Sequence, residues 1–315
     1  MSAVPTIDIS RRDAPQKVAR TCEQTGFLII SGHGFPAELL ARAQRELLAF
    51  FDRPLAEKNR CHPSGPAKQR GYHGFATRGL AYTLGQQTPP DLRETVFLGP
   101  VDDHRAYYAS LPEAATSYAP NLIPEGLEET LVALYREYER LARDMMRVFA
   151  AALELPESHF DGTLDRHFSI MSCHHYPALE KPPLPGQLRT GAHTDYGAMT
   201  ILAATDAEGG LEVRMPDGSW AGVQPKPGEF VVNLGDMMAR WTNDRWASTL
   251  HRVVNPPLGV AASRRLSIGM FVHPNYDQRI ECVPTCLAPG EKPRYPVMTA
   301  GEHIKRKIER SHETA

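Results

Sequence analysis

The sequence predicts a mainly β fold, a sandwich or jelly roll, with supporting α-helices. From residue 168 onwards the chain breaks into seven or so short apolar segments at close spacing. Turn signals separate several of them, namely "PDG", "KPG" and "TND". Helix-forming stripes lie ahead of this β-rich part, and 315 residues suffice for one large domain. We therefore expect helices packed around a β-rich centre in a single domain, residues 1–315.

The N-terminal elements follow from local patterns. "TIDIS" alternates apolar and polar residues like a short strand. A helix is expected from near Pro15 to Gly26, because proline suits the first helical turn and glycine the position after the last turn. The apolar residues 27–30 predict a buried strand. "AELLARAQRELLAFFDRP" predicts an amphipathic helix that stops before Pro54.

The middle and the end of the chain are less uniform. Residues 60–125 are rich in glycine, proline and isolated aromatics, which is typical of loops or short irregular strands that line a cleft. Residues 125–155 carry apolar side chains at steps of three and four, which predicts a long helix packed on the core. A last helix is expected near Thr299, because Thr299 and Glu302 have the spacing of a capping box.

The composition argues against several classes of partner. A net charge of −2 does not favour nucleic acid or anionic lipid. No apolar run approaches the length of a membrane span, and "MSAVPTIDIS" lacks the regions of a secretory signal. Five cysteines without CxxC spacing are typical of reduced thiols, although Cys282 and Cys286 leave a bridge or metal site as a weaker alternative. We expect a cytoplasmic protein with no nucleic-acid or membrane partner and leave its oligomeric state open.

Two metal-ligating side chains stand two residues apart in "GAHTDYGAMT". In a strand, His193 and Asp195 would point to the same face. His251 in "STLHRVV" is the candidate third ligand, from another strand. Two imidazoles and one carboxylate suit Fe(II) and leave three positions for a cosubstrate and O₂, whereas zinc more often has closed sites that include cysteine. Among thirteen histidines the His-x-Asp pair alone is a weak signal, so the surrounding sequence must support it.

A second polar pair stands in "RRLSIGMF". Arg265 and Ser267 would share one strand face, and burying them there is costly unless an anion meets them. A guanidinium fork beside a hydroxyl suits a carboxylate. Arg264 would point the other way, toward solvent. The alternative is an ion pair between Arg265 and a nearby Asp or Glu.

The order HTD, HRV and RLS resembles the isopenicillin N synthase-like family of Fe(II)/2-oxoglutarate-dependent oxygenases. The similarity extends to "GAHTDYGAMTIL" and "RRLSIGMFVHPNYD" in the C-terminal half, and to "VPTIDIS", "GFLIISGHGF" and "DRPLAEKNR" in the N-terminal region. It covers nearly the whole chain. The resemblance implies a double-stranded β-helix, which is a distorted, cupin-like jelly roll. It also implies an N-terminal family region at residues 1–125 and a catalytic core at residues 165–280.

The resemblance further implies a site and a reaction. Fe(II) would be held by His193, Asp195 and His251, and the cosubstrate 2-oxoglutarate by Arg265, Ser267 and Tyr176. The protein would be a non-haem dioxygenase that uses O₂, with ascorbate as reductant in vitro. It would form succinate and CO₂ while it hydroxylates, desaturates or cyclises a small molecule, in a biosynthetic pathway of specialised metabolism.

The chain departs from the family pattern at two places. Plant members often have asparagine two residues before the tyrosine, where this chain has His174. "GVAAS" at residues 259–263 lengthens the approach to Arg265.

The prime substrate and the reaction outcome are left open by the sequence. Six candidates for the substrate pocket are Arg70, Tyr72, Phe75, Arg93, Phe97 and Phe271. Ordinary packing or surface ion pairs are the alternative for each. The two arginines would suit an anionic substrate, such as an amino acid or peptide derivative. The alternative functions are an iron oxidase of the same family that does not use 2-oxoglutarate, and a non-catalytic binding protein on this fold.

Overall fold

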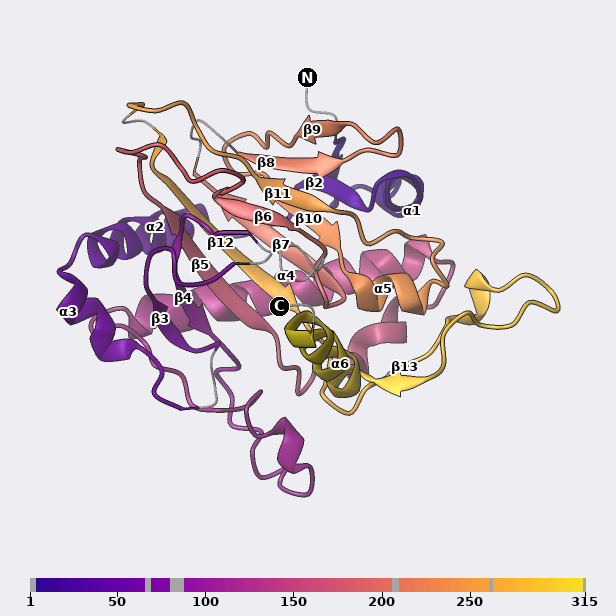
Figure 1. Ribbon diagram of the computed structural model, residues 1–315. Coiled ribbons are helices and arrows are strands. Elements are labelled where there is room, and N and C mark those ends of the chain that lie inside the picture. Colours follow the sequence, from indigo (N-terminus) through magenta and orange to yellow (C-terminus); the bar gives the residue numbers. More distant parts are fainter. Residues whose placement is uncertain (1–3, 66–68, 80–87, 206–209, 261–262, 314–315) are drawn as a thin grey trace.

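The strands form two sheets that pack against each other (Figure 1). The computed structural model describes residues 4–65, 69–79, 88–205, 210–260 and 263–313. Within these ranges the larger sheet has eight strands in the order β1-β2-β10-β7-β12-β5-β4-β3, and the smaller has four in the order β6-β11-β8-β9. The described strands do not close into a barrel. The predicted β-rich jelly roll with supporting helices is confirmed.

The strands of the large sheet are β1 (Thr6–Asp8), β2 (Phe27–Ser31), β3 (Gly71–His73), β4 (Glu94–Leu98), β5 (Ile170–Tyr176), β7 (Met199–Ala204), β10 (Phe230–Leu234) and β12 (Arg265–Val272). Those of the small sheet are β6 (Thr190–His193), β8 (Leu211–Arg214), β9 (Trp220–Gly222) and β11 (His251–Val253). A separate pair consists of β13 (Arg279–Ile280) and β14 (Met298–Thr299). The helices are α1 (Ala14–Gln24), α2 (Ala37–Phe51), α3 (Leu55–Lys58), α4 (Glu128–Ala152), α5 (Asp236–Trp241) and α6 (Ala300–Glu313). Short 3₁₀ turns lie at Asn59–Cys61, Pro112–Ala114, Glu157–Thr163 and Pro284–Cys286.

The large sheet separates two apolar cores. Along β2, Leu28 and Ile30 belong to the larger core, which the sheet shares with α1, α2 and α4. Phe27 and Ile29 alternate with them and belong to the smaller core between the two sheets. Because both faces are covered, the strand is apolar from Phe27 to Ile30 instead of alternating. The large sheet therefore has an outer face against the helices and an inner face against the small sheet.

The predicted helices are present with slightly shorter bounds. The expected helix at 125–155 is α4, which ends at Ala152 and crosses the outer face of the large sheet (Figure 1). The capping box of α6 is formed, because Glu302 N–H donates to Thr299 Oγ1 (3.1 Å) and Thr299 N–H to Glu302 Oε2 (2.8 Å). The spacing of apolar side chains and the residue types at the helix ends were thus sufficient to locate these helices in the sequence.

The sequence left residues 60–125 open between loop and short strand. Within them, β3 and β4 are short strands that extend the large sheet beyond β5. The strand β4 is buried at every position, but it begins with the polar residues Glu94 and Thr95. The helix α5 was not predicted; it has six residues and lies between β10 and the expected turn. The "TND" turn follows it, with Asn243 and Asp244 at positive φ.

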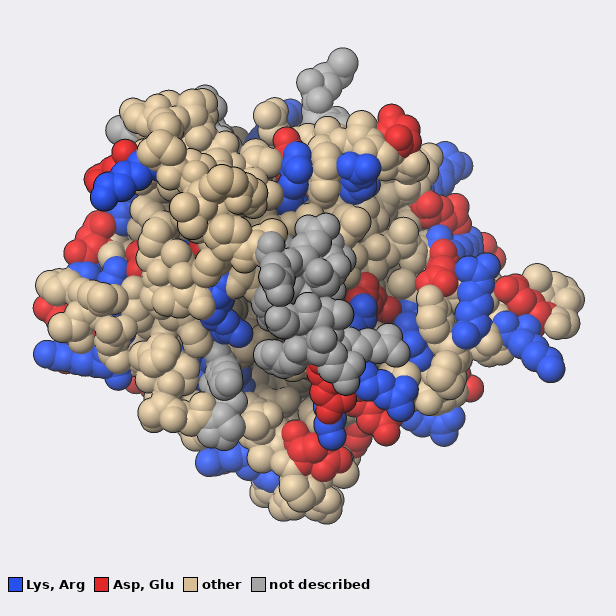
Figure 2. All heavy atoms as spheres, viewed as in Figure 1, with Lys and Arg blue, Asp and Glu red and all other residues tan. Residues whose placement is uncertain are grey.

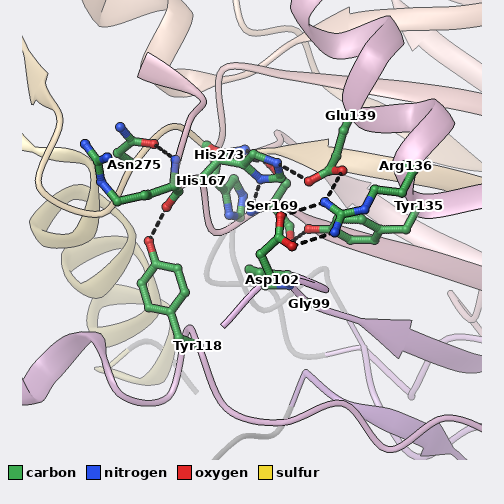
Figure 3. A network of polar contacts seen from close by, with 12 residues as sticks. Gly99, Asp102, Tyr118, Tyr135, Arg136, Glu139, His167, Ser169, His273 and Asn275 are labelled. Carbon is green, nitrogen blue, oxygen red and sulfur yellow. Dashed lines mark hydrogen bonds and ion pairs between the residues drawn. The ribbon is translucent and has the colours of Figure 1, made fainter. Parts of the chain in front are cut away.

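A network of polar contacts joins α4 to the strands (Figure 3). Glu139, buried on α4, accepts hydrogen bonds from His167 Nε2 (2.8 Å) and Arg136 Nη1 (3.0 Å). Ser169 N–H donates to His167 Nδ1, so the His167 proton is on Nε2. Burial alone would raise the pKa of Glu139, but the hydrogen bond from His167 and the charge of Arg136 hold it below its usual value. The carboxylate thus anchors α4 beside the start of β5.

The expectations on surface charge, on the cysteines and on membrane-spanning segments can also be compared with the structure. Figure 2 shows Lys and Arg side chains interspersed with Asp and Glu on one face of the molecule. The five cysteines are all unbridged. No helix in the described ranges has the length and apolar character needed to cross a bilayer.

We predict that Glu139→Gln lowers the free energy of unfolding by about 1–2 kcal/mol at neutral pH, because the buried carboxylate that accepts from His167 and Arg136 is replaced by an uncharged carboxamide. The folded pKa of Glu139 lies below its unfolded value near 4.5, so the carboxylate stabilises the fold above that value. This contribution is lost as the pH falls through the lower folded pKa, and the difference from wild type should shrink in acid.

Urea unfolding at neutral pH and at pH values below about 4.5 measures this difference. Glu129→Gln is the matched control on the same helix, because the Glu129 side chain is 88% exposed and its removal should cost less than about 0.5 kcal/mol. Equal losses in the two variants would contradict the anchoring role of Glu139.

Candidate metal centre

Two histidines face each other across the small sheet. The strands β6 and β11 pair antiparallel, with His193 directly opposite His251. Their ring centroids are 4.3 Å apart, and both residues are buried. Direct pairing brings two residues from distant parts of the chain onto one spot of the sheet surface.

Asp195 joins them from beyond the end of β6. The strand ends at His193, so the expectation that both residues lie in one strand is wrong; residues 194–198 connect β6 to β7. Asp195 Oδ1 nevertheless lies 3.6 Å from His193 Nε2 and 3.8 Å from His251 Nε2. One ligand atom of each of the three residues lies within 4.8 Å of the other two. The predicted set therefore converges.

The two imidazoles are oriented by backbone carbonyls. His193 Nδ1 lies 2.8 Å from the Gly191 carbonyl oxygen, and His251 Nδ1 lies 3.1 Å from that of Thr249. A carbonyl accepts only, so both Nδ1 atoms carry the proton and both Nε2 lone pairs face the centre of the triad. Burial, and then the neighbouring His251, lower the pKa of His193 to about 3. The His193 ring is therefore neutral, as a metal ligand must be.

The carboxylate of Asp195 is held by the large sheet. Its Oδ2 accepts hydrogen bonds from Thr200 Oγ1 of β7 (2.5 Å) and Asn233 Nδ2 of β10 (2.7 Å). The other oxygen, Oδ1, is left facing the two histidines. Burial would raise the pKa of Asp195, but the hydrogen bonds from Asn233 and Thr200 favour the ionised carboxylate, and the pKa lies below its usual value. Asp195 therefore presents one ionised oxygen to the triad.

The loop that carries Asp195 is tied to the start of α5. Asp236 N–H donates to the Asp195 carbonyl (2.8 Å) and Met237 N–H to that of Gly197 (3.0 Å). Gly235 permits this approach, because a Cβ there would lie 2.2 Å from the Gly197 oxygen. The unpredicted helix α5 thus fixes the Asp195 loop.

The donor set fits Fe(II). Two neutral imidazole nitrogens and one carboxylate oxygen lie on one side of a common point, each with its remaining polar atom already engaged. This is the arrangement of mononuclear non-haem iron sites, which leave further positions for cosubstrate and O₂. No cysteine takes part, which disfavours a closed structural zinc site.

The predicted anion-binding residues lie on the inner face of the large sheet. In β12, Arg265 is directly opposite Tyr176 of β5, and Ser267 is opposite His174. All four are buried. The Tyr176 hydroxyl lies 3.1 Å from Thr190 Oγ1 of β6, which links the large sheet to the strand that carries His193.

Two other arginines lie near this pair. Arg264 points to the opposite face from Arg265, as expected; its side chain is partly exposed there, and it also donates to His175 Nε2 (2.9 Å) and to the carboxylate of Asp52 (2.8 and 3.2 Å). Arg189, fully buried, was not predicted; it donates to the Ser263 carbonyl and lies over the Tyr176 ring at 5.7 Å. Burial, and then Arg265, lower its pKa to about 10. The middle of "GVAAS" lies outside the described residues.

Three of the six substrate-pocket candidates lie together on the inner face. Phe97 of β4 and Phe271 of β12 flank His174, with ring centroids 5.9 and 6.5 Å from it. Arg93 Nη1 lies 3.1 Å from His174 Nε2. Thr200, which holds Asp195, is the β7 partner of Phe271, so these residues share the face of the triad.

The other three candidates lie elsewhere. Arg70 is buried and donates to the carbonyls of Gln69, Ser117 and Ala119. Tyr72 donates to Glu94 (2.6 Å), which faces the helices. Phe75 is 43% exposed.

Some site residues had weak signals in the sequence. Asn233 was detectable as the polar position in the apolar strand "FVVNL", since a buried polar side chain needs a partner. Thr200 and Arg189 had no such signal, because threonine is common in strands and the arginine stands beside a loop.

Comparison with known proteins gives two family-model matches. The model of the 2OG-Fe(II) oxygenase superfamily matches residues 167–274, which contain the triad and Arg265. A model described as the N-terminal part of non-haem dioxygenases in morphine synthesis matches residues 4–126.

Similar proteins span nearly the whole chain. A 2-oxoglutarate-Fe(II) type oxidoreductase of Emericella nidulans is 34% identical and covers 95% of this chain and 85% of its own. Validamycin A dioxygenase of Streptomyces hygroscopicus subsp. limoneus is 30% identical, covering 97% and 86%. The crystal structure of a full-length Neurospora crassa protein in complex with alpha-KG superimposes with a TM-score of 0.83 at 27% identity, covering 99% and 96%. The chain belongs to the 2OG-Fe(II) oxygenase superfamily and is a 2-oxoglutarate-dependent dioxygenase that uses Fe(II).

Proposed function

We propose that His193, Asp195 and His251 are the iron ligands of this dioxygenase. The observation that carries the assignment is the direction of their free lone pairs, because both Nε2 atoms and Asp195 Oδ1 face one point. The hydrogen bonds at the opposite atoms of each side chain hold that direction before any metal binds.

The same proposal assigns the cosubstrate site to Arg265, Ser267 and Tyr176. The guanidinium and the hydroxyl lie two residues apart on the buried inner face, which suits the distal carboxylate of 2-oxoglutarate. Bound Fe(II) and 2-oxoglutarate supply the chemistry: O₂ is consumed, 2-oxoglutarate becomes succinate and CO₂, and the substrate gains oxygen or loses two hydrogens. The residues of the chain bind and orient the iron, the cosubstrate and the substrate, and they exclude water from the site.

We further propose that the prime substrate is a small organic molecule that lies against Phe97 and Phe271. Two aromatic rings beside a buried, neutral His174 offer an apolar wall with one polar position. Arg93 at this position favours a substrate with an acidic group. The similarity to validamycin A dioxygenase favours a role in specialised metabolism. The single-domain organisation and cytoplasmic location remain predictions.

Succinate formation tests the function. The purified protein with Fe(II), ascorbate, O₂ and 2-oxoglutarate should release more succinate when a small-molecule library contains its substrate. Oxidation of a library member without succinate would instead favour the 2-oxoglutarate-independent oxidase, and lack of Fe(II) binding would favour a non-catalytic binding protein.

We predict that His193→Ala and Asp195→Ala each abolish Fe(II) binding and 2-oxoglutarate turnover while the fold is kept, because the triad lies at one edge of a large core. Iron content and circular dichroism measure the two effects. His159→Ala, at an exposed histidine, is the control and should keep its iron. Retention of iron by Asp195→Ala would remove Asp195 from the ligand set.

We predict that Arg265→Ala raises the 2-oxoglutarate concentration required for half-saturation by about 30-fold or more. The loss of a charge-assisted partner for a buried carboxylate costs on the order of 2–5 kcal/mol. Anaerobic titration of the Fe(II) protein with 2-oxoglutarate measures the affinity without a prime substrate.

Arg264→Ala is the matched control for this prediction. It removes the neighbouring guanidinium, which binds His175 and Asp52 on the outer face of the sheet. It should reduce stability and leave 2-oxoglutarate affinity near that of wild type. Unchanged 2-oxoglutarate affinity in Arg265→Ala would remove Arg265 from the cosubstrate site.

A further inference from the structure

A buried carboxylate outside the triad connects the two sheets beside His193. Asp91 precedes β4 and is 2% exposed. Its Oδ1 accepts the backbone N–H of Gly191 on β6 (2.9 Å), and its Oδ2 lies 3.2 Å from Arg93 Nη2. The Asp91 N–H also donates to the Arg78 carbonyl (2.8 Å). Asp91 therefore fastens the small-sheet strand β6 to the segment that enters the large sheet at β4.

Gly191 is the residue that orients His193. Its carbonyl oxygen accepts the Nδ1 proton of His193 at 2.8 Å, while its N–H is bound by Asp91. Glycine has the widest backbone freedom of any residue, so the direction of this carbonyl is poorly determined by the chain alone. The hydrogen bond from Gly191 N–H to a fixed carboxylate removes that freedom.

The other histidine is oriented in a similar way without a charge. Thr249, whose carbonyl accepts from His251 Nδ1, is held by its own hydroxyl, which donates to the Thr25 carbonyl (2.7 Å). Gly191, whose carbonyl accepts from His193 Nδ1, has no side chain that could hold its backbone in place. The ion pair of Asp91 with Arg93 holds it instead, through the Gly191 N–H. The partners that orient a ligating histidine typically contribute 10–100-fold to metal affinity.

We propose that Asp91, held by Arg93, is a positioning residue for the iron ligand His193 and acts through the backbone of Gly191. Arg93 fixes the second oxygen of Asp91, so the carboxylate can direct its first oxygen at β6 only. The inference rests on the proposed role of His193 as a ligand. It assigns a metal-positioning function to the "PDLRE" segment, which lies about 100 residues before the triad.

The test is metal affinity, measured with Co(II) by competition against a chelator, together with the Co(II) absorption spectrum as a reporter of ligand geometry. Asp91→Ala should bind Co(II) about 10-fold more weakly than wild type and change the spectrum. Asp91→Asn keeps an oxygen that accepts from Gly191 N–H but loses the ion pair with Arg93. It should therefore recover part of the affinity, and it provides the measurement if Asp91→Ala does not fold.

Glu139→Gln is the matched control, because it also removes a buried carboxylate but leaves the bonds around the triad intact. It should lose stability without losing Co(II) affinity. Wild-type affinity and spectrum in both Asp91 variants would overturn the proposal and reduce Asp91 to a structural role. If His193→Ala also kept wild-type Co(II) affinity, the ligand assignment itself would fail, so the two failures are distinguishable.

Discussion

The site depends on the carboxylate of Asp195, because its two oxygens contact residues of two different sheets. Oδ2 is bound by Thr200 and Asn233 of the large sheet, and Oδ1 faces the histidines of the small sheet. The triad therefore closes only when the sheets are held at the right separation. The apolar core between them, with Phe27, Tyr176 and Val213 among its members, sets that separation.

The inner and outer faces of the large sheet carry different polar systems. On the outer face, Glu94 accepts from His175, Lys58 and Tyr72, and Arg264 links His175 to Asp52 of the α2 end. Buried charges of this kind are tolerated only when each is paired. Successive residues at the start of β12 point to opposite faces, so Arg264 lies on the outer face and Arg265 on the inner one. The two polar systems therefore lie on opposite faces of the sheet and share no contact among the hydrogen bonds described above.

The sequence was sufficient for the parts of the fold that repeat a pattern. The spacing of apolar side chains by three and four residues located α2 and α4, and the capping residues Thr299 and Glu302 located the start of α6. The His-x-Asp spacing found two members of the triad, although Asp195 lies in a loop instead of the strand. The residue types and their strand positions suggested His251 as the third ligand and Arg265 with Ser267 as a carboxylate site, and the family resemblance implied that this carboxylate belongs to 2-oxoglutarate.

The parts that escaped prediction depend on tertiary partners. Glu94 suggests an exposed charge in the sequence, because its partners Lys58 and His175 come from distant segments, so β4 stayed open between loop and short strand. The helix α5 is too short to give a periodic pattern, and its hydrogen bonds to the Asp195 loop are visible only in the structure. Strand alternation separated Arg264 from Arg265 in the sequence, but the partners of Arg264, His175 and Asp52, come from distant segments and were not predicted.

His174 shows how the chain accommodates a departure from the plant members' asparagine. Burial, and then the charge of Arg93, lower the pKa of His174 well below its usual value. A neutral imidazole offers one donor and one acceptor, as a carboxamide also does on a smaller frame. Thr95 Oγ1 lies 2.9 Å from His174 Nδ1, and Arg93 Nη1 lies 3.1–3.2 Å from the two ring nitrogens. The substitution therefore adds no charge to the inner face. It adds ring area between Phe97 and Phe271, which makes this wall more aromatic than an asparagine would allow.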